Sequence, residues 1–250
     1  MREKLQGEVA VITGASSGIG WATALRLASA KMKVVLIARR AERLEELAKQ
    51  IHNQGGVALT LPTDLKDTHA IENTFQIIRN TWGGTRVLIN NAGLGFSAPL
   101  LSGETAKWEE MLQVNILALC VATREAINDM QNSGTWGHVL HVSSMAGHRV
   151  PEGSGVYSAT KYAVRSLTEG LRKELRTLNS QVRVSAVSPG FVETEFAAHY
   201  HGSSQAAIDT YQQYPVIQPS EVAELIWTIL SQPEHVQIHD ILLRPTAQLS

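Results

Sequence analysis

The stretch Val9-Ala10-Val11-Ile12-Thr13-Gly14-Ala15-Ser16-Ser17-Gly18-Ile19-Gly20 decides the fold of this chain. It joins a short apolar run, typical of a buried strand, to a glycine-rich turn and the start of a helix. Gly14 permits the tight turn, and Gly18 and Gly20 allow backbone and helix to approach a ligand closely. Amide groups at the helix N-terminus would face a pyrophosphate, so the stretch predicts a dinucleotide-binding loop.

The rest of the chain alternates short β-branched runs with longer amphipathic segments. The runs are almost continuously apolar, which suits parallel strands that are covered on both faces. This alternation predicts a single-domain α/β Rossmann fold over residues 1–250, with a doubly wound parallel sheet of about seven strands and helices on both faces. The expected strands are Val9–Thr13, Lys33–Ala38, Ala58–Pro62, Val87–Asn90, His138–Ser143, Val182–Ser188 and a last one around Gln237–Leu243. The expected helices are Gly18–Ala30, Ala41–Gln54, Asp67–Trp82, Lys107–Asn132, Ser154–Leu178 and Ser220–Leu230.

Composition narrows the class of protein. The formal net charge of −1 gives no reason to expect nucleic acid or an anionic membrane as a partner. Cys120 is the only cysteine, so no disulfide within the chain is expected. The first residues, Met1–Glu8, are polar and charged, and no apolar stretch is long enough for a signal core or a membrane span. The nine histidines form no zinc pattern. We therefore expect a cytoplasmic enzyme without a metal.

The end of the second expected strand bears on cofactor choice. An acidic residue there would accept hydrogen bonds from the ribose hydroxyls of NAD and repel a 2′-phosphate. This chain has Ala38 followed by Arg39 and Arg40. A guanidinium binds phosphate bidentately, so we expect NADP(H), with Arg39 as the first phosphate ligand and Arg40 as the second. One of them could be merely a solvated charge at a helix start, and Ser16 could add a hydroxyl contact.

Tyr157 and Lys161 are four positions apart in an expected helix, so both can point into one cleft. A free tyrosine titrates near 10, and a Lys ammonium about 4 Å away contributes roughly 4 kcal/mol at an effective dielectric near 20. We therefore expect Lys161 to lower the pKa of Tyr157, with desolvation opposing it, and Tyr157 to act as a general acid/base. Ser144 lies thirteen positions upstream, after the fifth expected strand. Its hydroxyl would stabilise an oxyanion.

The motifs Thr13–Gly20, Asn90-Asn91-Ala92-Gly93, Ser144 and Tyr157-Ser158-Ala159-Thr160-Lys161 occur in one order along the chain. Together they resemble the short-chain dehydrogenase/reductase family over nearly the whole length. The stretches 114–126, 145–150, 157–175 and 235–246 further resemble a group in that family that contains dehydrogenase/reductase family member 11 and the NADP-dependent farnesol dehydrogenases.

The resemblance implies an oxidoreductase that interconverts small-molecule carbonyls and alcohols by hydride transfer, on hydrophobic or diketone-type substrates. It implies that Asn115 supports a water that links Lys161 to solvent, and that Asp64 and Leu65 frame the adenine, although Asp64 could instead cap a helix. The implied catalytic residues are Asn115, Ser144, Tyr157 and Lys161. The implied cofactor-binding residues are Gly14, Ser16, Ser17, Gly18, Ile19, Gly20, Arg39, Arg40, Asp64, Leu65, Asn91, Ala92, Gly93, Tyr157, Lys161, Pro189, Gly190, Val192 and Thr194.

Two further expectations concern the segment 193–219 and assembly. The segment leaves the carboxyl end of a strand, where ligands bind in open α/β sheets, and we expect it to be a substrate lid rather than an ordinary surface helix pair. By resemblance, the long helices Lys107–Asn132 and Ser154–Leu178 would form a homodimer, and the last strand a homotetramer, although amphipathic helices could equally serve the monomer core.

Two alternative functions remain open from the sequence. A 3-oxoacyl-carrier-protein reductase shares the catalytic residues, but it needs a basic surface that the near-neutral charge does not suggest. A non-catalytic NADP-sensing protein would typically have lost the catalytic tyrosine, whereas this chain retains Tyr157.

Overall fold

Seven parallel strands form one sheet in the order β3-β2-β1-β4-β5-β6-β7. The computed structural model describes residues 1–133 and 136–248. The strands are β1 (Val9–Thr13), β2 (Lys33–Ala38), β3 (Val57–Pro62), β4 (Val87–Asn90), β5 (Trp136–Val142), β6 (Gln181–Pro189) and β7 (Asp240–Leu243). The chain builds outward from β1 in one direction and from β4 in the other. The predicted fold class is therefore confirmed, and the topological switch lies between β1 and β4.

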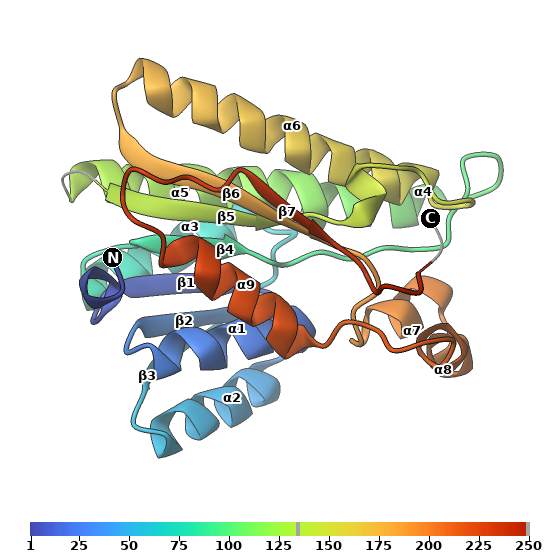
Figure 1. The fold of residues 1–250 in the computed structure, drawn as a ribbon, viewed down its shortest axis with the longest axis horizontal. Coiled ribbons are helices and arrows are strands. Elements are labelled where there is room, and N and C mark those ends of the chain that lie inside the picture. The colour runs from blue at the N-terminus through green and yellow to red at the C-terminus, as the bar shows by residue number, and fades with distance from the viewer. Residues whose placement is uncertain (134–135, 249–250) are drawn as a thin grey trace.

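Helices cover both faces of this sheet (Figure 1). They are α1 (Gly18–Ser29), α2 (Ala41–Asn53), α3 (Thr68–Trp82), α4 (Thr105–Leu112), α5 (Ala118–Asn132), α6 (Gly155–Thr177), α7 (Phe196–His201), α8 (Ser204–Tyr211) and α9 (Pro219–Leu230). Alternate residues of β1 enter separate cores. Ala10 and Ile12 pack with α1, α2 and α9, whereas Val9 and Val11 pack with α3, α5 and α6. This two-sided burial explains why the strands are apolar at every position.

One predicted helix is interrupted. The sequence predicts a single helix over Lys107–Asn132, but α4 and α5 are separated by a π-helical segment, Gln113–Leu117. The Ala118 amide donates to the Gln113 carbonyl, which adds one residue to the turn. Asn115 lies in this wider turn and is buried. Such single π-helical turns inside α-helices are frequent at functional sites.

The last strand is also shorter than predicted, because Gln237, Ile238 and His239 join the sheet partly through side chains. The Val184 amide donates to Gln237 Oε1 at 3.0 Å, and the Ser185 hydroxyl donates to the Ile238 carbonyl. Regular pairing with β6 begins at Asp240. The strand around Gln237–Leu243 therefore exists, but its ladder covers only its second half.

The carboxyl ends of β1, β4, β5 and β6 open on the same edge of the sheet. Beyond β6, α7 and α8 lie together at that edge (Figure 1). The segment predicted as a lid therefore contains two short helices. Within residues 1–133 and 136–248, no helix has the length and apolarity needed to cross a membrane.

Candidate active site

The glycine loop is fixed to the end of β4 by Thr13 and Asn91. Thr13 Oγ1 accepts the amides of Asn91 and Ala92 at 3.1 and 3.0 Å. Asn91 Nδ2 donates to the carbonyls of Thr13 and Gly14 at 2.9 and 3.1 Å. Gly14 has φ +67°, a backbone conformation that favours glycine. These bonds set the loop between β1 and α1 before any ligand binds.

Gly20 has a different role from the other two glycines of the motif. A Cβ there would lie 2.4 Å from the Gly14 carbonyl oxygen and 2.5 Å from Asn91 Nδ2. Gly20 does not line the cavity described below. Its missing side chain makes room for the loop's own backbone, and its predicted contact with cofactor stays a prediction.

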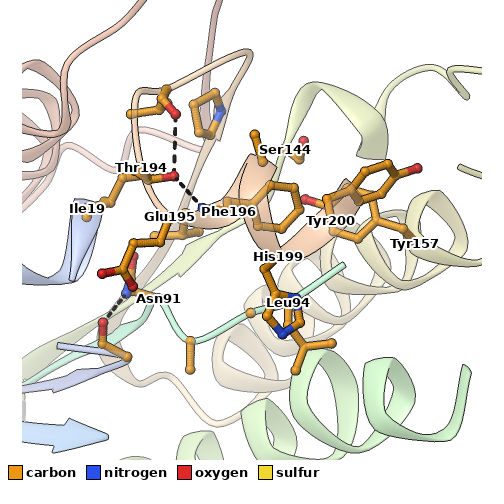
Figure 2. A pocket seen from close by; sticks show the side chains of 18 of the residues that line it. Ile19, Asn91, Leu94, Ser144, Tyr157, Thr194, Glu195, Phe196, His199 and Tyr200 are labelled. Carbon is orange, nitrogen blue, oxygen red and sulfur yellow. Dashed lines mark hydrogen bonds between the residues drawn. The ribbon is translucent and has the colours of Figure 1, made fainter. Parts of the chain in front are cut away.

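A cavity of about 680 Å³ opens at the carboxyl ends of the strands. It brings together residues that the sequence places far apart, and Figure 2 shows ten of its lining residues by name. Of the predicted site residues, it is lined by Gly14, Ser16, Ser17, Gly18, Ile19, Arg39, Arg40, Asp64, Leu65, Asn91, Ala92, Gly93, Ser144, Tyr157, Lys161, Pro189, Gly190, Val192 and Thr194. Only Gly20 and Asn115 of that set are absent from the lining.

Tyr157 and Lys161 lie one turn apart near the start of α6, as the helical spacing predicts. Lys161 is buried, and its Nζ donates to the carbonyl of Val142, at the end of β5, at 3.1 Å. The same nitrogen lies 5.8 Å from the centroid of the Tyr157 ring. Ser144 follows β5, and its Oγ accepts the Ala146 amide at 3.1 Å. The Ser144 hydroxyl hydrogen therefore stays available for another acceptor.

The electrostatics of the pair differ from the expectation. Burial is the largest influence on Tyr157 and raises its pKa above the ordinary value, while the neighbouring Ser144 hydroxyl acts in the opposite direction. Burial also lowers the pKa of Lys161 to about 8. Of the two opposing effects that the sequence predicts, desolvation is therefore the larger, because placing a phenolate in the interior is costly.

Asn115 lies behind the cavity wall. Its Oδ1 accepts the Leu94 amide at 2.9 Å, and its Nδ2 donates to the Leu94 carbonyl at 2.8 Å and to Thr160 Oγ1 at 3.0 Å. A Cβ on Gly93 would lie 3.3 Å from Lys161 Nζ and 3.5 Å from Asn115 Oδ1. Asn115 thus positions the segment beside Lys161 from the π-helical turn, and its support of a water at Lys161 stays a prediction.

The two arginines after β2 have different surroundings. Arg39 Nη1 lies 3.9 Å from Glu110 Oε1 and its side chain is 58% exposed. Arg40 donates through Nε and Nη2 to Ser16 Oγ at 3.2 and 3.1 Å, and Nη2 lies 2.8 Å from Glu195 Oε2. Arg39 therefore keeps most of its donors for a ligand, whereas Arg40 is held by protein groups.

Asp64 and Leu65 line the cavity after β3. Asp64 Oδ1 accepts the Lys66 amide at 3.0 Å, which forms a tight turn. The cap of α3 is instead Asp67, whose side chain accepts the amides of His69 and Ala70. Asp64 is thus not the helix cap that the sequence left as an alternative.

Aromatic side chains from α7 cover Tyr157. The ring centroids of Tyr157 and Phe196 are 5.4 Å apart, and those of Tyr157 and Tyr200 are 6.1 Å apart. Figure 2 shows the three rings grouped at one end of the cavity. Gly95 lies against all three, and a Cβ there would be 2.8 Å from Phe196 Cζ. No sequence motif marks Gly95. Its role could not be predicted because two of the rings that it contacts, Phe196 and Tyr200, come from α7.

Two histidines lie close to the residues of the site. His141 is buried in β5, where Nδ1 lies 2.8 Å from Thr168 Oγ1 and Nε2 lies 3.4 Å from Thr123 Oγ1. Burial lowers the pKa of His141 to about 3, so it is neutral at physiological pH. His148 Nε2 lies 3.1 Å from Asp240 Oδ2 of β7, a contact that is an ion pair only when the imidazole is protonated.

Two other lining residues were missed by the sequence interpretation. Glu195 precedes α7 and pairs with Arg40. Gln248, near the end of the chain, accepts the Phe191 amide through Oε1 at 3.1 Å and lines the cavity. Neither belongs to a motif, and both reach the site only through folding. Among the described residues, no group of three or more His, Cys, Asp or Glu is placed to hold a metal ion.

A doubly wound sheet, a glycine loop at its switch point and a Tyr–Lys pair with a nearby serine define a nucleotide-dependent oxidoreductase of the Rossmann class. Residues 8–204 match the family model described as short chain dehydrogenase. The chain belongs to the short-chain dehydrogenase/reductase family, as its motifs predict.

Several relatives and solved structures are similar to nearly the whole chain. Dehydrogenase/reductase SDR family member 11 from Bos taurus is 43% identical, covering 99% of this chain and 100% of that protein. A closed form of serine dehydrogenase complexed with NADP+ has a TM-score of 0.91 and 31% identity, covering 97% of this chain and 96% of that one. A metagenomic short-chain oxidoreductase in complex with NADP has a TM-score of 0.82 and 31% identity, covering 98% and 99%.

Proposed function

We propose that this protein is an NADP(H)-dependent oxidoreductase that interconverts hydrophobic carbonyls and alcohols, with Tyr157 as the general acid/base. The observation that carries the proposal is one cavity with two arginines near its glycine loop and Tyr157, Lys161 and Ser144 along its wall. The serine dehydrogenase and metagenomic oxidoreductase structures, complexed with NADP+ and NADP, support the choice of cofactor.

The residues present fit a phosphorylated dinucleotide. Arg39 offers an uncommitted guanidinium to a 2′-phosphate, with Arg40 and Ser16 beside it. The loop from Gly14 to Ile19 would hold the pyrophosphate at the start of α1. Lys161 would bind the nicotinamide ribose, and the segment from Pro189 to Thr194 would hold the carboxamide. When bound, the nicotinamide would supply or accept the hydride, and its oxidised form would add positive charge near the phenol.

The chain's own residues would handle the proton and the developing charge. Because burial raises the pKa of Tyr157, its phenol is protonated at neutral pH and can donate to the carbonyl oxygen in reduction. Ser144 would donate a hydrogen bond to that oxygen, since its Oγ takes only an acceptor role toward Ala146. Lys161, with a pKa lowered to about 8, is mostly an ammonium at pH 7 and keeps donors beyond its bond to Val142.

The lining supports an apolar substrate without a carboxylate. Of the described lining residues, the Lys and Arg side chains are Arg39, Arg40 and Lys161. The first two are at the glycine loop and the third is beside Tyr157, so a substrate acid would find no dedicated cation. The remaining wall near Tyr157 is mainly apolar or aromatic, with Leu94, Met145, Phe196 and Tyr200. It also carries the polar side chains Glu152, Ser154 and His199. This pattern favours hydrophobic or diketone substrates over amino or hydroxy acids.

The segment 193–219 would act as the substrate lid. Its α7 residues line the cavity and pack on Tyr157, so movement of α7 would expose the phenol. Assembly as a homodimer or homotetramer stays a prediction, which light scattering of the purified protein would test.

The test is NADPH consumption by the pure protein over a panel of ketones and aldehydes, from small diketones and 3-oxo esters to steroids and isoprenoid aldehydes. We expect turnover of hydrophobic or diketone members, little turnover of 3-oxo acids, and slower rates with NADH. Tight NADPH binding without turnover of any panel member would contradict the proposal.

A further inference from the structure

Arg40 joins two parts of the cavity wall. Its Nε and Nη2 form one edge of the guanidinium, and that edge faces Ser16 of the glycine loop and Glu195 before α7. Nη2 also donates to the Ser16 carbonyl at 3.3 Å. A guanidinium edge is the fork that binds phosphate or carboxylate bidentately. In this structure protein groups occupy that fork, so a phosphate could use it only by displacing one of them.

Glu195 is the group that a phosphate would displace. Ser16 is neutral and its hydroxyl can accept from Arg40 and donate to a phosphate at once. The Glu195 carboxylate can only accept, so it can hold the Arg40 fork but cannot donate a hydrogen bond to a phosphate. Hydrogen bonding from Arg40 is the largest cause that lowers the pKa of Glu195, so the carboxylate is ionised at neutral pH. Figure 2 shows the Glu195 side chain directed away from the rings of Phe196, Tyr200 and Tyr157.

We infer that Glu195 is a specificity-determining residue for the cofactor: it holds Arg40 in competition with the 2′-phosphate and thereby lowers the preference for NADPH over NADH. The inference rests on the proposed function, because it assumes that the arginine end of the cavity receives the phosphate. Arg39, whose contact with Glu110 is 3.9 Å, would supply the main phosphate contact, and Glu195 would set how much Arg40 adds.

The exposure of the Arg40–Glu195 ion pair sets the expected change in NADPH affinity. The side chains of Arg40 and Glu195 are 44% and 59% exposed, and exposed ion pairs change equilibria by about twofold to fivefold. Removing the charge of Glu195 should tighten NADPH binding by this factor. NADH has no 2′-phosphate, so its affinity should change little.

The experiment is a double-mutant cycle with two cofactors. Dissociation constants for NADPH and NADH are measured by fluorescence titration for the wild type, Glu195→Gln, Arg40→Ala and the double variant. We expect Glu195→Gln to lower the dissociation constant for NADPH about two- to fivefold. The dissociation constant for NADH should stay unchanged within experimental error. In the Arg40→Ala background, the same substitution should have no effect on NADPH.

Glu193→Gln is the matched control. Glu193 is two positions away and exposed, and its Oε2 accepts from Gln218 Nε2 at 2.8 Å rather than from Arg40. It should leave both dissociation constants unchanged. An unchanged NADPH affinity in Glu195→Gln, an equal gain for NADH, or a gain that persists without Arg40 would each overturn the inference.

Failure of the proposed function has a different signature. If the wild type bound NADH as tightly as NADPH and Arg39→Ala weakened both equally, the phosphate site itself would be wrong. If the wild type preferred NADPH and lost that preference in Arg39→Ala, the phosphate site would stand, and the Glu195→Gln result alone would decide the inference.

Discussion

The ring of Phe196 lies over Tyr157 with a centroid distance of 5.4 Å and an interplanar angle of 48°. Phe196 is the first residue of α7, and Tyr157 is near the start of α6. This contact brings an apolar side chain from the segment after β6 onto Tyr157, the residue proposed as the general acid/base. The same packing contributes to the burial that raises the pKa of Tyr157.

Gly95 sets how closely these rings approach. A Cβ at this position would lie 2.8 Å from Phe196, 3.0 Å from Tyr157 and 3.0 Å from Tyr200. We expect Gly95→Ala to displace the rings and to lower kcat/KM by about tenfold to a hundredfold, because small shifts of reacting groups are costly. Steady-state kinetics would measure this loss. Gly170→Ala is the control, since a Cβ there meets nothing within 4 Å. Equal kinetics for both variants would contradict the packing role of Gly95.

Tyr157→Phe removes the proposed proton donor while keeping the ring and its aromatic contacts. Loss of general acid catalysis typically lowers rates by about 10²–10⁴. We expect a loss of kcat in this range, with NADPH affinity changed less than about threefold and an unchanged circular dichroism spectrum. Turnover at the wild-type rate would show that Tyr157 is not the acid/base.

Arg39→Ala tests the phosphate site. Hydrogen bonds to charged groups contribute about 1.5–3 kcal/mol, so NADPH binding should weaken about tenfold to a hundredfold. NADH binding should change little, because the lost partner is the 2′-phosphate. Lys49→Ala on α2 removes the same charge from an exposed position outside the cavity and should affect neither cofactor. Isothermal titration with both cofactors would reveal the difference, and equal losses would exclude the assignment.

Lys161→Met should abolish activity and raise the free energy of unfolding. Burial lowers the lysine pKa to about 8 from an ordinary value of 10.5, so the unfolded chain binds this proton more tightly than the folded one. The cost to folding is fully present below pH 8 and disappears as pH rises toward 10.5. At pH 7, removing the charge should stabilise the cofactor-free protein by on the order of 3 kcal/mol, less any loss of packing.

Urea unfolding of the wild type and Lys161→Met at several pH values would measure this effect. The difference between the two free energies of unfolding should shrink between pH 8 and 10.5, while Lys161→Met stays inactive throughout. A difference that does not vary over this range would mean that Lys161 carries no burial cost.

The strands and the glycine loop could be predicted because their signals are local. β1, β2 and β4 have the predicted bounds, since continuous apolar runs end at the polar residues that leave the sheet. The pairing of Tyr157 with Lys161 also follows from helical spacing alone. The break between α4 and α5 could not be predicted, because Asn115 is held by Leu94 and Thr160 from two other segments.

The sequence by itself determined the class of this protein: a doubly wound sheet, a nucleotide loop and a Tyr–Lys–Ser set, all encoded by short motifs and periodicity. The tertiary structure decided how these parts work together. It assigned Gly20 to the packing of the loop, held Arg40 against Glu195, and brought α7 over Tyr157. It also decided that burial, rather than the charge of Lys161, dominates the tyrosine's pKa. Burial and the distances between remote segments exist only in the folded chain, so no local pattern could have supplied them.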